Sequence, residues 1–310
     1  MLYFIVNEKS KSGNAKQIWK EIEEVLKVRN VSYQAFVSEY RGHAGKLATE
    51  ICAMDDNDIC LVAVGGDGTA NEVINGITDF EKVRFGVIPT GSGNDLARGL
   101  SLSKDPKNGV IHILNAMKKT HEDTWCMDLG EVNFGEKKRL FAISAGIGLD
   151  ALVCKKALKS TIKDILNKIR LGKLTYLVLT VQSLFTMQTA DAELFFDREE
   201  GLQKKRMIFT AAMNFKAEGG GVPMAPAASA CDGKLSFCEA AGIPKWRTFL
   251  CLPFLVAAKH TSVHGFSVTD AKDCTIRLSR PMVVHADGEY CGEVTEVHFH
   301  CLPGKLRVLK

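Results

Sequence analysis

The sequence lacks the cysteine spacings that mark a zinc site or a disulfide framework. Its ten cysteines are scattered from Cys52 to Cys301, and no two of them form a CxxC pair. No secretory leader precedes them, and structural disulfides are rare in reducing compartments. We therefore expect free thiols and a cytoplasmic location.

Long hydrophobic runs are also missing. The longest apolar stretches, Leu2 to Val6 and Ile59 to Val64, have the length of strands, whereas a membrane-spanning helix needs ~20 apolar residues. The formal net charge of +4 does not indicate a nucleic-acid partner, but it is compatible with contact to an anionic membrane surface. We predict no transmembrane segment and no nucleic acid, and we leave peripheral membrane association open.

No fixed-period repeat, low-complexity tract or long linker interrupts the chain. Its 310 residues, 46% of them apolar, are enough for two domains with a core each. The oligomeric state stays open, with a homodimer among the alternatives.

Residues 1–124 alternate short β-branched runs with helical periodicity. Leu2 to Val6 reads as a strand, and Ile18, Ile22, Val25 and Leu26 follow at helical spacing. Further strands are expected near 33–37, 58–64 and 84–88, each followed by a helical segment. This alternation predicts a doubly wound parallel sheet, whose ligands bind at the carboxyl ends of the strands.

From about Trp125 the pattern changes to successive strand-like runs separated by turn residues, which predicts an antiparallel sheet or sandwich. A helical insertion is expected over 150–185 and a short helix over 246–260. The expected strands are 126–132, 139–144, 192–196, 206–213, 234–238, 275–278 and 282–285, with a last short strand over 306–309.

The strongest motif is GGDGTANE at 65–72, directly after the strand that ends at Val64 and at the start of a predicted helix. Glycines let backbone N–H groups approach phosphate oxygens, and a helix N-terminus supplies partial positive charge. The Asp67 carboxylate is then positioned for Mg²⁺ or for the nucleophile. A glycine pair alone is more often an ordinary strand-to-helix turn, so the accompanying motifs decide.

A second loop, PTGSGND at 89–95, again follows a strand and opens a helix, so two phosphate-type loops are expected beside one crevice. A third candidate, NEKSKSGN at 7–14, is equally well an ordinary helix cap. None of the three is a Walker A loop or a G-x-G-x-x-G dinucleotide fingerprint.

These motifs occur in order with SEYRGHA at 38–44, FAISAGIGLD at 141–150, a glycine-rich segment ending in DGKL at 219–235, and DGE at 287–289. The combination resembles the diacylglycerol kinase catalytic-domain family, which includes bacterial soluble lipid kinases and sphingosine kinases. The resemblance covers nearly the whole chain. It implies a Rossmann-like nucleotide-binding domain over 1–124, a lipid-binding β-sandwich domain over 125–303, and a strand at about 304–310 that returns to the first domain.

The resemblance further implies an ATP- and Mg²⁺-dependent lipid kinase that phosphorylates a hydroxyl of diacylglycerol or a similar lipid at a membrane surface. Glu289 is implied as the general base, with Asp67 as the alternative. A structural Mg²⁺ is implied between the Asp232 carboxylate and the backbone carbonyls of Ser229 and Lys234, oxygen ligands that suit a hard cation. The implied nucleotide contacts are Asn7, Ser38, Gly65, Gly66, Asp67, Gly68, Thr69, Asn71, Glu72 and Ser92.

Several positions depart from the family pattern. Glu8 stands where proline is common, Ser38 where threonine is common, and Ser144 where asparagine is common. Ser38 keeps a hydroxyl. Asp128, in Asp-Leu-Gly, resembles an acidic position between domains and is equally well a solvated strand-end carboxylate.

The sequence indicates less clearly which residues bind the lipid substrate or the membrane. Apolar stretches at 174–185 and 249–256 could line an acyl pocket, although apolar helical stripes are more often core. The lysine-rich stretch 155–170 predicts an amphipathic helix that could rest on anionic headgroups or simply face solvent. Histidines 260, 264, 285, 298 and 300 show no metal-ligand spacing and are expected to be structural or surface residues.

Two other readings compete with a lipid kinase. A NAD kinase would share GGDGT, but PTGSGND and DGE argue against it. A catalytically silent nucleotide or lipid sensor could keep the fold, but retention of Asp67, Glu72, Asp232 and Glu289 favours an active enzyme. A dehydrogenase is weaker still, because the dinucleotide fingerprint is missing.

Overall fold

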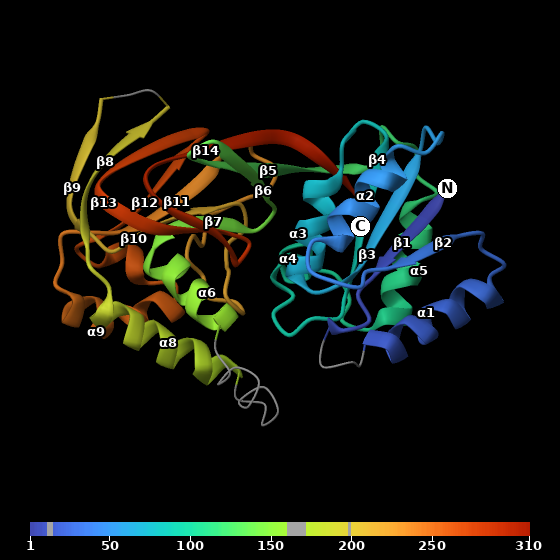
Figure 1. Cartoon of the computed structure of the whole chain (residues 1–310), viewed down its shortest axis with the longest axis horizontal. Helices are drawn as coiled ribbons and strands as arrows, with labels where there is room; N and C mark the ends of the chain where they lie inside the picture. Colours follow the sequence, from blue (N-terminus) through green and yellow to red (C-terminus); the bar gives the residue numbers. More distant parts are fainter. Residues whose placement is uncertain (11–14, 160–171, 198–199) are drawn as a thin grey trace. The chain divides into compact units, whose positions relative to one another are not determined.

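The computed structural model describes residues 1–10, 15–159, 172–197 and 200–310. The chain divides into two compact units (Figure 1). Unit 1 comprises Met1–Asp128 and Gly304–Lys310, and unit 2 comprises Leu129–Pro303. The chain therefore leaves unit 1 once and returns to it at the end.

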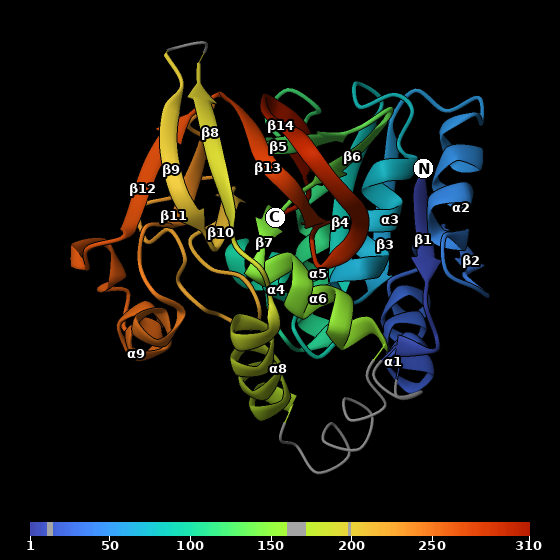
Figure 2. The same cartoon turned by 60° about the vertical axis from the view of Figure 1, so that its left-hand side comes forward.

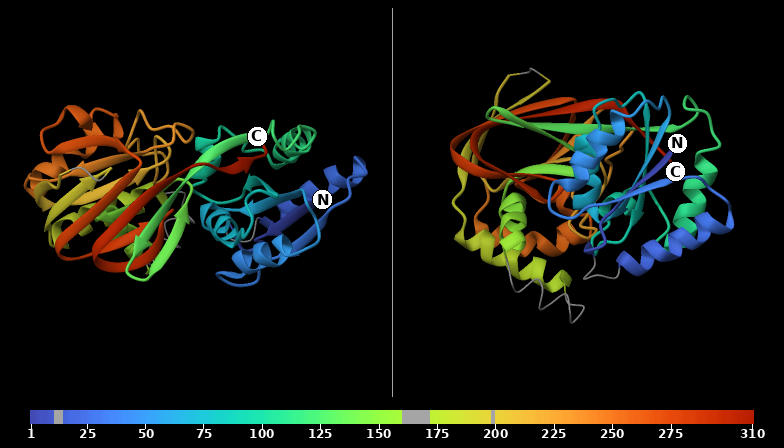
Figure 3. Two further views of the ribbon diagram at one scale, coloured as in Figure 1. Left: turned by 90° about the horizontal axis from the view of Figure 1, so that it is seen from above. Right: turned by 45° about the vertical axis from the view of Figure 1, so that its right-hand side comes forward.

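Unit 1 contains a parallel sheet in the order β2-β1-β3-β4, and the C-terminal end of β14 lies parallel to β4. Helices α1 and α5 pack together on one face, and α2 and α3 pack together on the other (Figure 3). The predicted doubly wound α/β fold is confirmed. The elements are β1 (Leu2–Val6), α1 (Ala15–Val28), β2 (Gln34–Val37), α2 (His43–Cys52), β3 (Ile59–Gly65), α3 (Asp67–Gly76), β4 (Val83–Pro89), α4 (Asp95–Gly99) and α5 (Pro106–Ala116). Strand β14 (Glu289–Val308) begins in unit 2, and only its end, from Gly304, belongs to unit 1.

The α2–α3 pair packs backbone against backbone. A Cβ atom at Gly76 would lie 2.1 Å from the Gly45 carbonyl oxygen, and one at Gly45 would lie 2.9 Å from the Glu72 carbonyl oxygen. Thr49 Oγ1 donates to the Gly76 carbonyl at 2.9 Å. This close approach fixes α3, the helix that begins in the GGDGTANE motif.

Unit 2 is an antiparallel β structure with helices inserted, as predicted. Its strands run in the order β12-β11-β10-β7-β13-β14; β8 pairs with β13 and β9, and β5 pairs with β14 and β6. The β8–β9 hairpin is yellow in Figure 2. The elements are β5 (Trp125–Phe134), β6 (Lys137–Phe141), β7 (Ser144–Gly148), α6 (Leu149–Lys159), α8 (Gly172–Thr186), β8 (Ala190–Phe196), β9 (Leu202–Met207), β10 (Phe209–Met213), β11 (Leu235–Ala240), α9 (Lys245–Val256), the 3₁₀ turn η2 (His260–Ser262), β12 (Phe266–Ala271) and β13 (Asp273–Ala286).

Strand β13 changes neighbours along its length. Residues 274–278 pair with β8, and residues 284–286 pair with β7. The pairing with β14 shifts register between Arg277 and Met282, where Pro281 lies. Because proline has no N–H for a ladder, it fits such an irregularity. The sequence predicted two separate strands here, and the structure has one bent strand.

Other expected strands divide or were missed. The run 206–213 divides into β9 and β10 at Ile208, after Arg206 takes a left-handed φ of 49°. The run 139–144 divides into β6 and β7. Strand β12 and most of β14 were not expected, although residues 266–269 (FSVT) and 297–301 (VHFHC) alternate apolar and polar side chains as a half-buried strand does.

All ten cysteines are free, in agreement with the sequence. In the part of the chain that the structure describes, no helix has the length and apolar character needed to cross a membrane.

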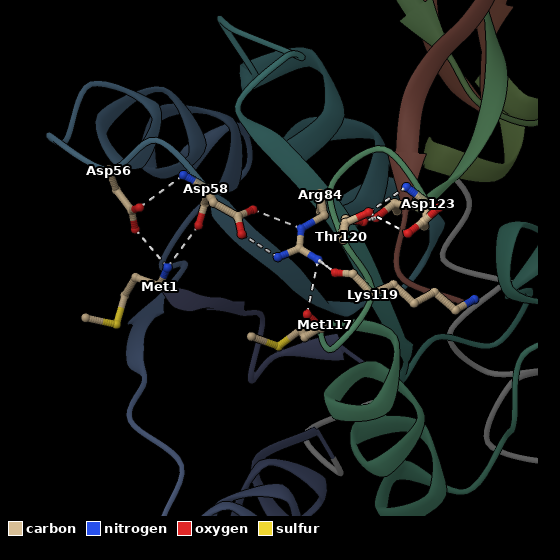
Figure 4. Close-up of polar contacts among 9 residues, drawn as sticks. Met1, Asp56, Asp58, Arg84, Met117, Lys119, Thr120 and Asp123 are labelled. Atoms are coloured by element: carbon tan, nitrogen blue, oxygen red, sulfur yellow. Dashed lines mark hydrogen bonds and ion pairs between the residues drawn. The ribbon is translucent and has the colours of Figure 1, made fainter.

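A buried arginine joins the amino ends of two strands to the end of a helix in unit 1 (Figure 4). Arg84, on β4, is 4% exposed, and its Nε and one terminal nitrogen donate to the two oxygens of Asp58 at 2.9 and 2.5 Å. The other terminal nitrogen donates to the carbonyls of Met117 and Lys119 at 3.3 and 3.0 Å, just after α5. One planar guanidinium therefore satisfies a carboxylate and two helix-end carbonyls.

We expect Arg84→Lys to lower the free energy of unfolding of unit 1 by about 1–3 kcal/mol, because an ammonium cannot reproduce this fork of donors. Asp58 is half exposed, so the ionic part of the effect is small. Denaturant unfolding measures the change, and Arg29→Lys at an exposed position is the control. Equal midpoints for the two variants would contradict the role given to Arg84.

Candidate active site

The two glycine-rich loops of unit 1 begin at the same level of the sheet. In the parallel pairing of β3 with β4, Gly65 lies opposite Pro89, so both strands end together. The Thr90 N–H donates to the Gly65 carbonyl at 2.8 Å. The structure thus brings together the two phosphate-type loops that the sequence predicts beside one another.

The glycines are required by the contact between these loops. A Cβ atom at Gly91 would lie 2.7 Å from Gly66 Cα, and one at Gly65 would lie 2.5 Å from Thr69 Cβ. Each distance is shorter than two carbon atoms tolerate, so a larger residue at position 91 would force the two loops apart, and one at position 65 would displace the first turn of α3. The same lack of side chains leaves the backbone of the loop before α3 accessible to a ligand.

Asp67 is held between the loops. Its Oδ1 accepts the Leu96 N–H at 3.1 Å, in the first turn of α4. Its Oδ2 lies 3.0 Å from where a Cβ atom of Gly93 would be. The carboxylate that the sequence assigns to Mg²⁺ or to catalysis is therefore oriented by the second loop.

The second loop is braced internally. Asn94, with a left-handed φ of 52°, accepts the Gly91 N–H and donates to the Gly91 carbonyl, both at 2.9 Å. Arg98 bonds the Asp95 carboxylate and donates to the Gly93 carbonyl at 2.7 Å. Ser92 lies exposed within this braced loop.

The remaining predicted nucleotide contacts surround α3. Asn7 Nδ2 donates to Thr69 Oγ1 at 3.0 Å, which joins the end of β1 to the first turn of α3, where Gly68 lies. Glu72 accepts the Gly42 N–H at 2.8 Å, before α2. Residues 11–14 of the third candidate loop lie outside the described residues.

Two predicted contacts are turned toward protein groups. Ser38 is 6% exposed, and its hydroxyl donates to the Val6 carbonyl at 3.4 Å. Asn71 is 1% exposed, and its side-chain oxygen Oδ1 accepts from Asn75 Nδ2 at 3.3 Å. These two residues support β1 and α3, and a nucleotide role for them stays a prediction.

In unit 2, the Asp-Gly-Glu motif forms a tight hairpin turn. Ala286 pairs with Glu289, and Asp287 and Gly288 have φ values of 47° and 80°. Positive φ at both central residues is the pattern of a two-residue type I′ turn, which favours Asp-Gly. Glu289, partly exposed, is thus the first residue of β14.

The Asp287 side chain anchors this turn. Its carboxylate accepts the N–H groups of Ala142 and Ile143 at 2.8 Å and of Ser144 at 3.1 Å. The Asp287 N–H returns a bond to the Ser144 carbonyl at 2.8 Å. Asp287 was not among the predicted site residues, although its place in an Asp-Gly pair after a strand was a signal for such a turn.

A buried histidine lies behind the turn. His285 Nδ1 accepts the Gly288 N–H at 3.2 Å, and Nε2 lies 3.1 Å from Asp150 Oδ2. Burial opposes protonation of the ring, but the hydrogen bond and charge of Asp150, with other nearby carboxylates, outweigh it and raise the pKa of His285. Both ring nitrogens of this buried histidine therefore have partners within the protein.

His285 belongs to a group of possible metal ligands with Asp150 and Glu218. One ligand atom from each lies within 4.8 Å of the others. Glu218 also bonds the Ser144 hydroxyl, and a Cβ atom at Gly146 would overlap the Asp150 carboxylate. A hydrogen bond joins His285 to Asp150, whereas the other oxygen of Asp150 is buried without a hydrogen-bond partner among the described residues. Sequence spacing could not reveal this group.

The predicted structural metal ligands lie in the irregular segment before β11. Asp232 is exposed, and its Oδ1 accepts the Lys234 N–H at 3.0 Å. The Ser229 hydroxyl lies 3.5 Å from Cys231 Sγ. A carboxylate together with backbone carbonyls of the same loop is a suitable donor set for Mg²⁺ or Ca²⁺.

Two further expectations concern charged residues, the basic helix at 155–170 and Asp128. Lys155 forms an ion pair with Glu293 at 2.5 Å, and this bond raises the pKa of Lys155. The rest of the predicted basic helix, from residue 160 to 170, lies outside the described residues. Asp128 is buried, and its Oδ1 accepts the Gly304 N–H at 2.7 Å, so it is not a solvated carboxylate.

Comparisons of sequence agree with these motifs. Residues 1–126 match the family described as "Diacylglycerol kinase catalytic domain", and residues 144–310 match "YegS C-terminal NAD kinase beta sandwich-like domain". The chain is 29% identical to "Putative lipid kinase YtlR" of Bacillus subtilis over 99% of this chain and 98% of that protein. It is 27% identical to a diacylglycerol kinase of the same species over 81% of this chain and 76% of that protein.

Solved structures share the fold. A "putative diacylglycerol kinase" of Bacillus anthracis aligns with a TM-score of 0.77 and 21% identity over 99% of this chain and 96% of that chain. A NAD kinase of Archaeoglobus fulgidus aligns with a TM-score of 0.55 and 14% identity over 100% of this chain and 94% of that chain. With both family matches in place, the chain belongs to the diacylglycerol kinase catalytic-domain family, and it is a kinase.

Proposed function

We propose that the protein transfers the γ-phosphate of ATP, with Mg²⁺, to a hydroxyl of diacylglycerol or a similar lipid. One observation carries the proposal. Strands β3 and β4 end side by side, the two glycine-rich loops that follow them are in contact, and the Asp67 carboxylate of the first loop accepts the Leu96 N–H that follows the second. The proposal places the enzyme in the cytoplasm, where it meets its acceptor at the membrane surface.

In this proposal the loop at 65–68 and the start of α3 bind phosphate oxygens. Gly66 precedes the helix in an extended conformation. The backbone N–H groups of the first turn of a helix have no acceptor within the helix, so they can bind an anion. Bound Mg²⁺ supplies neutralisation of the charge on the transferring phosphoryl group. Asp67 contributes a carboxylate whose orientation Leu96 fixes.

We propose Glu289 as the general base. Its carboxylate takes the proton of the acceptor hydroxyl as the oxygen bonds to the γ-phosphorus, and the bond from that phosphorus to the bridging oxygen breaks to release ADP. The anchoring of Asp287 by three N–H donors gives the turn before Glu289 the rigidity that a base requires.

A NAD kinase is the second candidate, because the Archaeoglobus NAD kinase, whose structure is a complex with ATP, shares the fold. A silent nucleotide or lipid sensor is the third. Incubation with labelled ATP, Mg²⁺, a panel of micellar lipids and, separately, NAD separates them. We expect label in a lipid; label in NAD alone, or in neither, contradicts the proposal.

We predict that Asp67→Asn lowers kcat by about 10²-fold or more with little loss of stability. The amide oxygen can still accept the Leu96 N–H, so the loop contact survives while the charge is lost. Steady-state kinetics and thermal unfolding measure the two effects. Asp55→Asn, at an exposed site in the same unit, should leave both unchanged.

Glu289→Gln should lower kcat by about 10²–10⁴-fold while nucleotide affinity persists, because the amide keeps the shape but is not basic. The matched control is Glu296→Gln on the same strand, where the carboxylate pairs with exposed Arg277. Parallel losses of Mg·ATP affinity and rate would assign Glu289 to metal binding and leave Asp67 as the base.

For the structural cation, Asp232→Ala should lower the melting temperature of unit 2 more than it weakens ATP binding. Asp232→Asn separates the causes, because it keeps the acceptor for the Lys234 N–H but loses the charge. If a cation is held, both variants are destabilised, and chelator lowers the melting temperature of the parent alone. If chelator leaves the melting temperature of the parent unchanged, the protein holds no structural cation at this loop.

A further inference from the structure

Helix α9 (Lys245–Val256) turns its more apolar side to solvent. Thr248, Cys251 and Leu255 form its buried side. The outward side carries Trp246 and Leu250, 60% and 57% exposed, with Phe249, Phe254 and Val256 also exposed. A surface helix of a globular protein normally shows the reverse pattern. The sequence favoured core for stretch 249–256, and the exposure of these side chains corrects that expectation.

Helix α8 extends the apolar surface. Its Val178 and Phe185 are 54% and 52% exposed, and the Phe185 ring lies 6.2 Å from the Phe249 ring. The Lys245 ammonium holds the helices together by donating to the carbonyls of Phe185 and Met187. Both helices appear at the lower left of Figure 1. We call this the α8–α9 surface: Val178, Phe185, Trp246, Phe249, Leu250, Phe254 and Val256.

The charged side chains within the two segments that carry this surface are all cations. The sequence has no aspartate or glutamate from Ala240 to Thr269, nor from 172 to 190. Arg247 and Lys259 are exposed at and just after α9. An apolar face with tryptophan and phenylalanine, bordered by cations, is the composition of helices that lie in the interface of a membrane.

We propose that the α8–α9 surface docks on an anionic lipid bilayer. The apolar side chains enter the boundary between headgroups and acyl chains, and Arg247 and Lys259 meet the lipid phosphates. An exposed apolar surface of this kind marks an interaction site, and the absence of acidic residues from segments 172–190 and 240–269 favours an anionic partner. The inference rests on the proposed function, because a lipid kinase must reach an acceptor that resides in a membrane.

The test uses the full chain and sedimentation with vesicles. The parent should bind vesicles of phosphatidylcholine with phosphatidylglycerol more tightly than phosphatidylcholine alone, and salt should weaken binding. The double variant Leu250→Glu/Phe254→Glu should bind at least about tenfold more weakly. Val28→Glu, at a site 83% exposed in unit 1, is the control and should bind like the parent.

A second measurement locates the contact. Brominated lipids should quench tryptophan emission in the parent, since Trp246 is exposed, whereas Trp19 is buried and Trp125 is only partly exposed. Trp246→Phe should keep vesicle binding but lose most of the quenching. Unchanged quenching in this variant would place the bilayer elsewhere and overturn the proposal.

A kinase assay with a water-soluble short-chain diacylglycerol, without vesicles, separates this inference from the proposed function. The double variant should phosphorylate it at the parent rate. Suppose that neither protein phosphorylates any lipid, while the parent binds vesicles and the double variant does not. Docking then stands and the proposed function fails. Docking is overturned if the double variant binds vesicles as tightly as the parent. It is also overturned if the parent binds no vesicles and instead forms dimers that the double variant does not form.

Discussion

The level ends of β3 and β4 are the constraint on which the candidate site of unit 1 depends. Parallel pairing places Gly65 opposite Pro89, so two loops leave the sheet together and must share space. They can do so only because Gly66 and Gly91 present no side chains to each other. The same constraint brings the N-terminus of α4 to the Asp67 carboxylate, which makes the orientation of that acid a consequence of strand register.

In unit 2, hydrogen bonds fix the position of the turn that precedes Glu289. The tip of a two-residue turn can twist unless other groups hold it. Here the carboxylate of Asp287 accepts three backbone N–H groups from residues 142–144, and His285 accepts the N–H of Gly288. Carboxylates that accept several N–H bonds are strongly held. The turn that carries Glu289 is therefore fixed from both sides, so a positioning role for Asp287 accompanies any catalytic role for its neighbour.

The sequence predicted the fold class because its signals are local. Apolar strands followed by helical periodicity indicated the parallel sheet of unit 1, and the order of motifs indicated the family. Strand β13 was read as two strands because Pro281 interrupts the pattern, whereas partners on both sides keep it continuous. The network of His285, Asp150 and Glu218 joins residues far apart in sequence, so no spacing could indicate it. The inward turn of Ser38 and Asn71 depends equally on tertiary contacts, and the roles of the candidate site residues stay predictions.

Helix α9 shows why periodicity alone is insufficient. The spacing of its apolar residues defines two faces, but only packing decides which face is covered. Here the covered face contains Thr248, while Trp246 and Leu250 remain outside. Burial of these side chains would be favourable by about 1.5–3 kcal/mol each, so a folded chain that leaves them in water keeps a driving force for association. Since the cations beside them repel one another, an anionic apolar medium relieves both the exposure and the repulsion, which a second copy of the same surface would not.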